Sequence, residues 1–131
     1  MPATDVIYYR ERDGSVPVLD WLRELARRNR RAAEKCVAQI NLLRDWGHEL
    51  RRPLADYLRD GIYELRVRVG RSQHRILYFF HGRNAVVLIH GLTKEAKVPA
   101  KEIERALVRM RSYKNNPALH THRKETPNGQ D

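Results

Sequence analysis

A period-two alternation of apolar and charged residues constrains this chain more than any other feature. Residues 61–69 read GIYELRVRV, in which apolar side chains from Tyr63 onward occupy every second position and charged side chains the positions between. Strand side chains alternate between two faces, so the segment predicts a β-strand with one apolar face and one charged face. The charged face carries Glu64, Arg66 and Arg68. Because a guanidinium binds two phosphate oxygens at once, arginines on one sheet face favour a nucleic-acid backbone as ligand.

The remaining pattern predicts an α+β domain. Strands are expected at residues 6–10, 62–69, 73–81 and 85–90. The last three are joined by short turns, so we expect a three-stranded antiparallel meander that joins the first strand in one sheet. Two helices, the first capped by Ser15 and the second ended by Gly47, form a hairpin, and a last helix begins at Pro99. We expect all three helices on one face of the sheet.

Apolar residues at helical spacing identify the buried side of each helix. The expected buried positions are Val18, Trp21, Leu22 and Leu25, then Ala33, Cys36, Val37, Ile40, Leu43 and Trp46, then Ile103, Ala106, Leu107 and Met110. Lys101, Glu102, Arg105 and Arg109 are expected to face outward. Residues 85–89 are apolar on both faces and predict a strand covered on both sides, whereas residues 48–60 contain Pro53 and predict an irregular loop.

Length and charge restrict the class of protein. At 131 residues the chain suits one domain, expected at residues 1–113, followed by a polar, flexible tail at 114–131. Twenty-six Lys and Arg against sixteen Asp and Glu give a net charge of +10, which favours nucleic acid as partner. We expect no membrane association, because no apolar run approaches the roughly 20 residues of a spanning helix and no signal peptide is evident. The single cysteine, Cys36, reads as a buried structural thiol, and the protein as cytoplasmic.

Metal and cofactor chemistry lack their usual sequence patterns. The carboxylates are scattered, the histidines show no ligand spacing, and no phosphate-binding loop, nucleophile elbow or dinucleotide fingerprint is present. If the protein is an enzyme, we expect it to need neither metal nor cofactor. RNA cleavage by its own 2′-hydroxyl fits that restriction, because it requires only a proton acceptor, cations for the phosphorane and a proton donor.

The segment from Arg59 to Lys97 holds the cations for such a reaction, with eight basic residues against three acidic ones. The candidates for catalysis are Arg66, Arg75, Lys94 and Lys97, with His90 as the preferred acid or base of the three strand histidines. Two structural alternatives stay open: an exposed strand face kept soluble by charge, and an Arg75 that serves a buried partner such as Glu64.

A second group of arginines extends the candidate RNA-binding surface. Arg68 and Arg71 lie on or beside the second predicted strand, and Arg27, Arg28, Arg30 and Arg31 flank the connection of the helical hairpin. The hairpin arginines form either a solvated turn or a contact with phosphate or the ribosome.

Three motifs in order give this chain a family resemblance: GIYELRVRVG, then HRILYFF, then HGLTKEAKVP followed by AKEIERA. The set is similar to the HigB-type, phage-derived branch of the RelE/ParE toxin superfamily, and the similarity extends from the VIYY strand to about Met110. The resemblance implies a RelE-like fold, akin to that of microbial ribonucleases. It also implies a toxin of a type II toxin–antitoxin system that cuts mRNA on the ribosome without metal.

By position, the resemblance implies that Arg66 or Arg68 holds the mRNA backbone, that Arg75 stabilises the phosphorane, and that Lys94 and Lys97 form the family's basic pair. RelE has a tyrosine where this chain reads VPAKEI, so either His90 or a lysine takes the acid–base role, or the chain is a weak nuclease. A toxin also implies an antitoxin, usually a helix-turn-helix protein from the adjacent gene. Two alternatives remain, a ParE-like gyrase inhibitor and a noncatalytic module that binds nucleic acid or an antitoxin.

Overall fold

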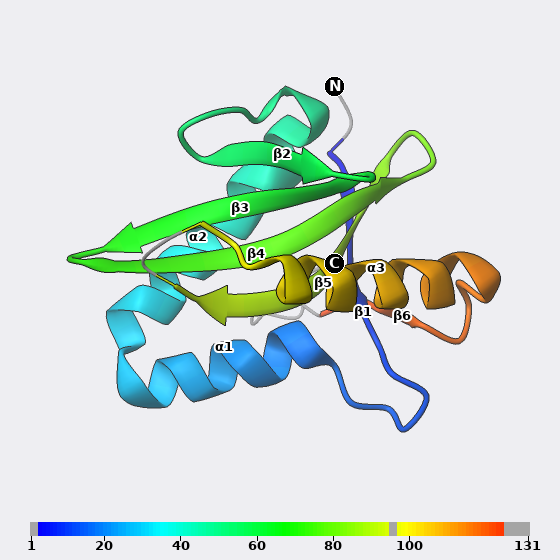
Figure 1. The fold of residues 1–131 in the computed structure, drawn as a ribbon, viewed down its shortest axis with the longest axis horizontal. Helices are drawn as coiled ribbons and strands as arrows, with labels where there is room; N and C mark the ends of the chain where they lie inside the picture. The colour runs from blue at the N-terminus through cyan, green and yellow to red at the C-terminus, as the bar shows by residue number, and fades with distance from the viewer. Residues whose placement is uncertain (1–2, 95–96, 125–131) are drawn as a thin grey trace.

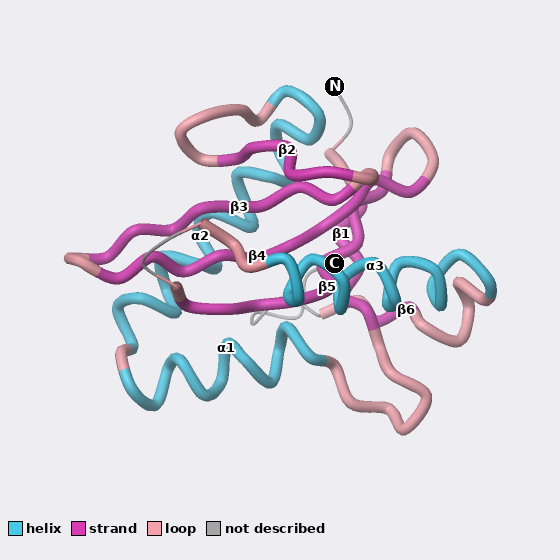
Figure 2. The backbone as a smooth tube through the Cα atoms, in the orientation of Figure 1, coloured by secondary structure: helices cyan, strands magenta, loops and turns pink. Residues whose placement is uncertain are grey.

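The computed structural model describes residues 3–94 and 97–124 and confirms an α+β fold that is consistent with the RelE type (Figures 1 and 2). The elements are β1 (Asp5–Tyr9), α1 (Pro17–Arg28), α2 (Arg30–Trp46), a 3₁₀ turn η1 (Gly47–Glu49), β2 (Ala55–Arg59), β3 (Ile62–Val69), β4 (Ser72–His81), β5 (Ala85–Thr93), α3 (Ala100–Asn115) and β6 (Thr121–His122). Within the described residues the strands form one sheet in the order β2-β3-β4-β5-β1-β6. β1 and β5 pair in parallel, and β3, β4 and β5 form the predicted antiparallel meander.

Helices cover both faces of this sheet, so the prediction of a single helical face is wrong. In Figure 1, α3 lies in front of the strands and α2 passes behind them. Strand β5 explains the arrangement, because Val86 and Leu88 pack in the core with α1 and α2 while Val87 and Ile89 pack in the core with α3. The predicted double coverage of this strand is therefore confirmed, and a doubly apolar strand requires an apolar partner on each side.

The segment predicted as an irregular loop contains the edge strand β2. Its residues pair antiparallel with β3, from Ala55 opposite Leu65 to Arg59 opposite Ile62. Two residues of α2 that were predicted to be buried are not, because Val37 is 36% exposed and Trp46 is 56% exposed. Cys36 is buried as expected, and that burial raises the pKa of its thiol to about 12.

Residues 114–124 do not form the expected tail. The first of them complete α3, and β6 then pairs antiparallel with β1 at Tyr8 and Tyr9. His120 is buried, its ring stacks on Tyr9 with centroids 5.0 Å apart, and its Nδ1 donates to the Arg10 carbonyl at 2.6 Å. The sequence has too few apolar residues here to reveal packing that depends on ring stacking and hydrogen bonds. The last residues of the predicted tail, 125–131, lie outside the described residues.

The start of α1 differs from the prediction as well. Ser15 does not cap the helix, since its hydroxyl donates to Asp13 at 2.7 Å and the helix follows Val16 with Pro17 in its first turn. Asn29 caps α2 instead, because its side-chain oxygen accepts a hydrogen bond from the Ala32 amide at 3.1 Å. No helix within residues 3–94 and 97–124 is long and apolar enough to span a membrane.

Candidate functional site

The two faces of β3 are as its alternation predicts. Leu65 and Val67 pack into the core beneath α1 and α2, and Glu64 and Arg66 lie on the opposite face, the one that α3 partly covers. Arg66 stands opposite Arg75 in the pairing of β3 with β4. Two cations at this spacing would repel one another without a counter-charge between them.

Glu64 supplies that counter-charge. Glu64 is 1% exposed, and Arg75 donates from Nη1 to its Oε1 while Arg66 donates from Nε to its Oε2 at 3.0 Å. Arg66 also donates from Nη2 to Asp56 at 3.2 Å. The buried partner suggested for Arg75 is therefore present. A buried carboxylate between two guanidinium groups fixes the position of both, because each alternative rotamer would leave a desolvated charge unpaired.

Both arginines line a pocket of about 560 Å³ that opens beside the N-terminus of α3. Lys97, Val98, Ala100 and Ile103 close its helical side, and Asp56, Leu58 and Arg59 its β2 side. Four basic side chains and two carboxylates face this space, so it carries a positive charge overall. The N-terminus of α3 adds the positive end of a helix dipole, which also favours an anion.

The structure does not bring every predicted cation into this pocket. Lys94 is exposed and outside its lining, and its backbone amide donates to the Gln73 carbonyl at 3.0 Å. Arg68 and Arg71 are exposed at the β3–β4 turn, where Arg68 Nε donates to the Gly70 carbonyl at 3.3 Å. These three residues lie near the β3–β4 turn, at the end of the sheet outside the pocket.

The arginines of the helical hairpin face solvent toward this same end. Figure 1 shows the α1–α2 connection and the β3–β4 turn at one end of the molecule, and Lys35 of α2 donates to the Arg68 carbonyl at 2.8 Å. Arg27 pairs with Glu24 at 3.7 Å and Arg30 with Glu34 at 3.5 Å, both in exposed intrahelical pairs, while Arg28 and Arg31 are exposed. The hairpin thus widens a basic surface without entering the pocket.

His90 lies beneath α3, not beside the two lysines as predicted. A register shift in the pairing of β4 with β5 places His90 opposite Leu77 and Leu88 opposite Tyr78, so Ile89 is the extra residue of a bulge. The bulge turns His90 to the α3 side, and His90 does not line the cationic pocket.

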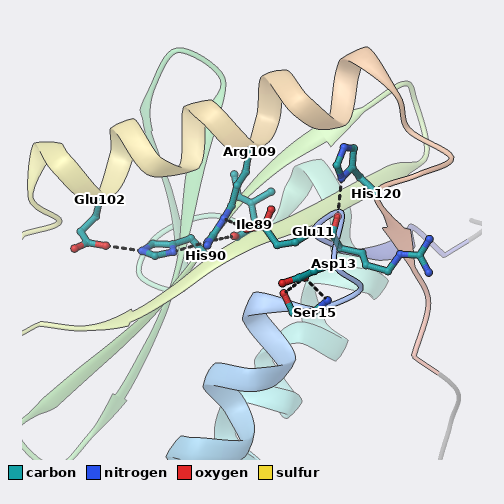
Figure 3. A network of polar contacts seen from close by, with 9 residues as sticks. Glu11, Asp13, Ser15, Ile89, His90, Glu102, Arg109 and His120 are labelled. Carbon is teal, nitrogen blue, oxygen red and sulfur yellow. Dashed lines mark hydrogen bonds and ion pairs between the residues drawn. The ribbon is translucent and has the colours of Figure 1, made fainter.

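Both ring nitrogens of His90 are hydrogen-bonded to α3 (Figure 3). Arg109 Nη1 contacts Nδ1 at 2.9 Å and also donates to the Ile89 carbonyl, so Nδ1 is the acceptor and Nε2 carries the proton. Nε2 lies 2.5 Å from Glu102 Oε1. Glu102 and Arg109, predicted to face outward, thus point at the sheet. Burial lowers the pKa of His90, which favours this neutral ring.

Asp56 and Tyr57 are site residues that were not predicted from the sequence, because residues 48–60 were expected to form a loop. Asp56 lines the cationic pocket, and Tyr57 lies on the opposite face of β2. The run ADYLR has no clear alternation and is too short to distinguish a strand by itself. In the described parts of the chain, no three His, Cys, Asp or Glu side chains form a group that could hold a metal ion.

One comparison with known proteins identifies a relationship. The model of the family described as "Phage derived protein Gp49-like (DUF891)" matches residues 20–111, which run from the first turns of α1 almost to the end of α3. The match contains the helical hairpin, strands β2 to β5, and every residue that lines the cationic pocket. No curated protein matches the chain.

Proposed function

The chain belongs to the Gp49-like family of phage-derived proteins, which is associated with the toxins of toxin–antitoxin systems, and on that premise we propose that it is a RelE/HigB-type mRNA endoribonuclease. The proposed toxin acts on ribosome-bound message and thereby stops translation. The observation that carries the proposal is the convergence of Arg66, Arg75 and Lys97 on one pocket at the N-terminus of α3.

Such a pocket suits the phosphorane of RNA self-cleavage. The 2′-oxygen attacks the adjacent phosphorus and loses its proton, the bond from phosphorus to the 5′-oxygen breaks, and that oxygen takes up a proton. Negative charge accumulates on the phosphoryl oxygens in between, and fixed cations stabilise it most when they need not reorganise. Arg75 and Arg66 meet that requirement because Glu64 holds both.

Proton transfer needs a group that arginine cannot provide. Lys97 is exposed and lines the pocket, so we assign it that role. His90 touches α3 through both nitrogens and acts in this proposal as a positioning residue that holds the helix over the sheet. Lys94, Arg68, Arg71 and the hairpin arginines Arg27, Arg28, Arg30 and Arg31 bind the flanking RNA of the message and the ribosome.

Neutralisation in this proposal comes from an antitoxin of the helix-turn-helix type, encoded by the adjacent gene. A protein with a net charge of +10 attracts an acidic segment, and one placed over the pocket would exclude the message. Mixing the two purified proteins before a cleavage assay measures this directly.

Induced expression in bacteria, followed by mapping of mRNA 5′ ends and of chromosome breaks, tests the proposed activity. We expect growth arrest with new mRNA ends, and loss of both with Lys97→Ala or Arg66→Ala. Arg111→Ala, an exposed α3 arginine outside the pocket, is the control and should keep full activity. Growth arrest with intact message and broken DNA would overturn the proposal and favour gyrase inhibition.

A further inference from the structure

An exposed aromatic ring stands on the edge strand β2, on the face opposite the cationic pocket. Tyr57 is 52% exposed although it belongs to the sheet. It lies opposite Tyr63 in the pairing of β2 with β3, and the two rings meet edge to face with centroids 5.0 Å apart. The Tyr63 ring in turn meets the Phe80 ring, with centroids 5.1 Å apart. The Tyr57 ring therefore packs on aromatic side chains that continue into the core.

The Tyr57 ring is held at its far end as well. Its hydroxyl accepts a hydrogen bond from the Gly61 amide at 3.0 Å. Gly61 and Asp60 both have positive φ, 88° and 54°, and this tight turn directs the amide back at the strand. A ring fixed at both ends loses little entropy on binding, which makes it a better stacking surface than a mobile side chain.

Basic residues line the same pocket as the ring. Tyr57 and Tyr63 line a pocket of about 480 Å³ together with Arg51, Arg52 and His48. Both arginines are exposed. An aromatic platform with cations beside it is the arrangement that binds single-stranded nucleic acid through base stacking and backbone charge.

Asp56 connects this second pocket to the first. It lines both, and its Oδ2 accepts from Arg52 Nε at 3.1 Å and from Arg66 Nη2 at 3.2 Å. Because the hydrogen bond from Arg52 lowers the pKa of Asp56, this carboxylate stays charged and keeps the two arginines near one another around the strand edge. A strand of RNA that crosses the edge of β2 would meet both pockets in succession.

We propose that Tyr57, Arg51 and Arg52 form a subsite that stacks an unpaired RNA base next to the phosphate held by Arg66 and Arg75. The inference rests on the proposed function, since it places a neighbouring nucleotide of the same message. Packing against Tyr63 covers only part of Tyr57, which remains 52% exposed beside Arg51 and Arg52. The subsite would favour flat bases without reading their hydrogen-bonding edges, because every base presents a π-face.

Fluorescence anisotropy at low salt tests the subsite with two labelled RNAs, a short single strand and a strand of equal length without bases. Wild-type protein should bind the base-bearing strand about ten-fold more tightly or better, the range of stacking on one aromatic ring. Tyr57→Ala should lose that preference, and Tyr57→Phe should keep it because the ring remains. Trp46→Ala, which removes an equally exposed ring from α2, should also keep it. Circular dichroism checks that each variant is folded.

The outcomes separate this inference from the proposed function. Binding that depends on Arg66 but is equal for both RNAs, or equal for wild type and Tyr57→Ala, overturns the base subsite and leaves the nuclease proposal in place. An absence of RNA binding by the isolated protein also overturns the subsite, while the mapping of mRNA ends still decides the nuclease. Retention of the base preference by Tyr57→Ala together with its loss in Trp46→Ala would move the stacking ring elsewhere.

Discussion

Glu64→Gln tests the cluster on which the cationic pocket depends. The substitution keeps the shape and one carbonyl oxygen but removes the charge between Arg66 and Arg75. Removing one partner of a buried ion pair costs roughly 3–5 kcal/mol, because the other charge stays desolvated. Arg75 is 7% exposed and bears more of that cost than Arg66, whose side chain is 33% exposed and keeps Asp56. We therefore expect a loss of about 2–4 kcal/mol in the free energy of unfolding.

Urea unfolding followed by circular dichroism at neutral pH measures that loss. Glu104→Gln is the matched control, because Glu104 pairs with Arg59 at 2.7 Å with its side chain 59% exposed. Removal of that exposed pair should leave the free energy of unfolding close to the wild-type value. If Glu64→Gln and Glu104→Gln lose the same small amount, the buried carboxylate does not hold the two arginines, and the reasoning about a preorganised pocket fails.

Two further predictions concern the packing of β5. Gly91→Ala should lower the free energy of unfolding by about 1–3 kcal/mol, because an added Cβ would lie 2.5 Å from Cε3 and 2.8 Å from Cγ of Trp21. A variant that unfolds at the same urea concentration as wild type would contradict this prediction. Since burial lowers the pKa of His90 below its ordinary 6.5, the unfolded chain takes up a proton there before the folded one does. The stabilisation of the folded state by the neutral His90 ring is therefore complete above about pH 6.5, and it is lost as the pH falls toward the pKa of His90 in the folded state. Urea unfolding of wild type and His90→Gln across this range should show a shallower loss for the variant, and parallel curves would refute the assignment.

Prediction from sequence succeeded where one element determines its own pattern. The alternation of β3 identified which side chains share a face, and the doubly apolar run of β5 identified a strand covered on both sides. Helical spacing likewise found the buried residues of α3. These patterns are set by the geometry of a single strand or helix, so neighbouring sequence is sufficient to reveal them.

Long-range contacts account for the errors. Strand β2 forms because β3 offers its edge, and residues 116–122 pack because Tyr9 and Arg10 receive His120. His90 turned toward α3 because a bulge of one residue reversed its expected direction. The first two causes lie outside the segments that they shape, and the bulge in β5 is defined only by its pairing with β4.

By itself, the sequence of this protein determined the composition of its candidate site: arginines on alternate positions, lysines after β5 and a net charge of +10. The tertiary structure alone decided which of these cations meet. Glu64, buried between two strands, holds Arg66 and Arg75 together, Lys97 joins them at the N-terminus of α3, and Lys94 and His90 stay outside. The physical reason is that a charge can be buried only beside a partner, and the partner is chosen by strand pairing and helix packing, which connect residues distant in the chain.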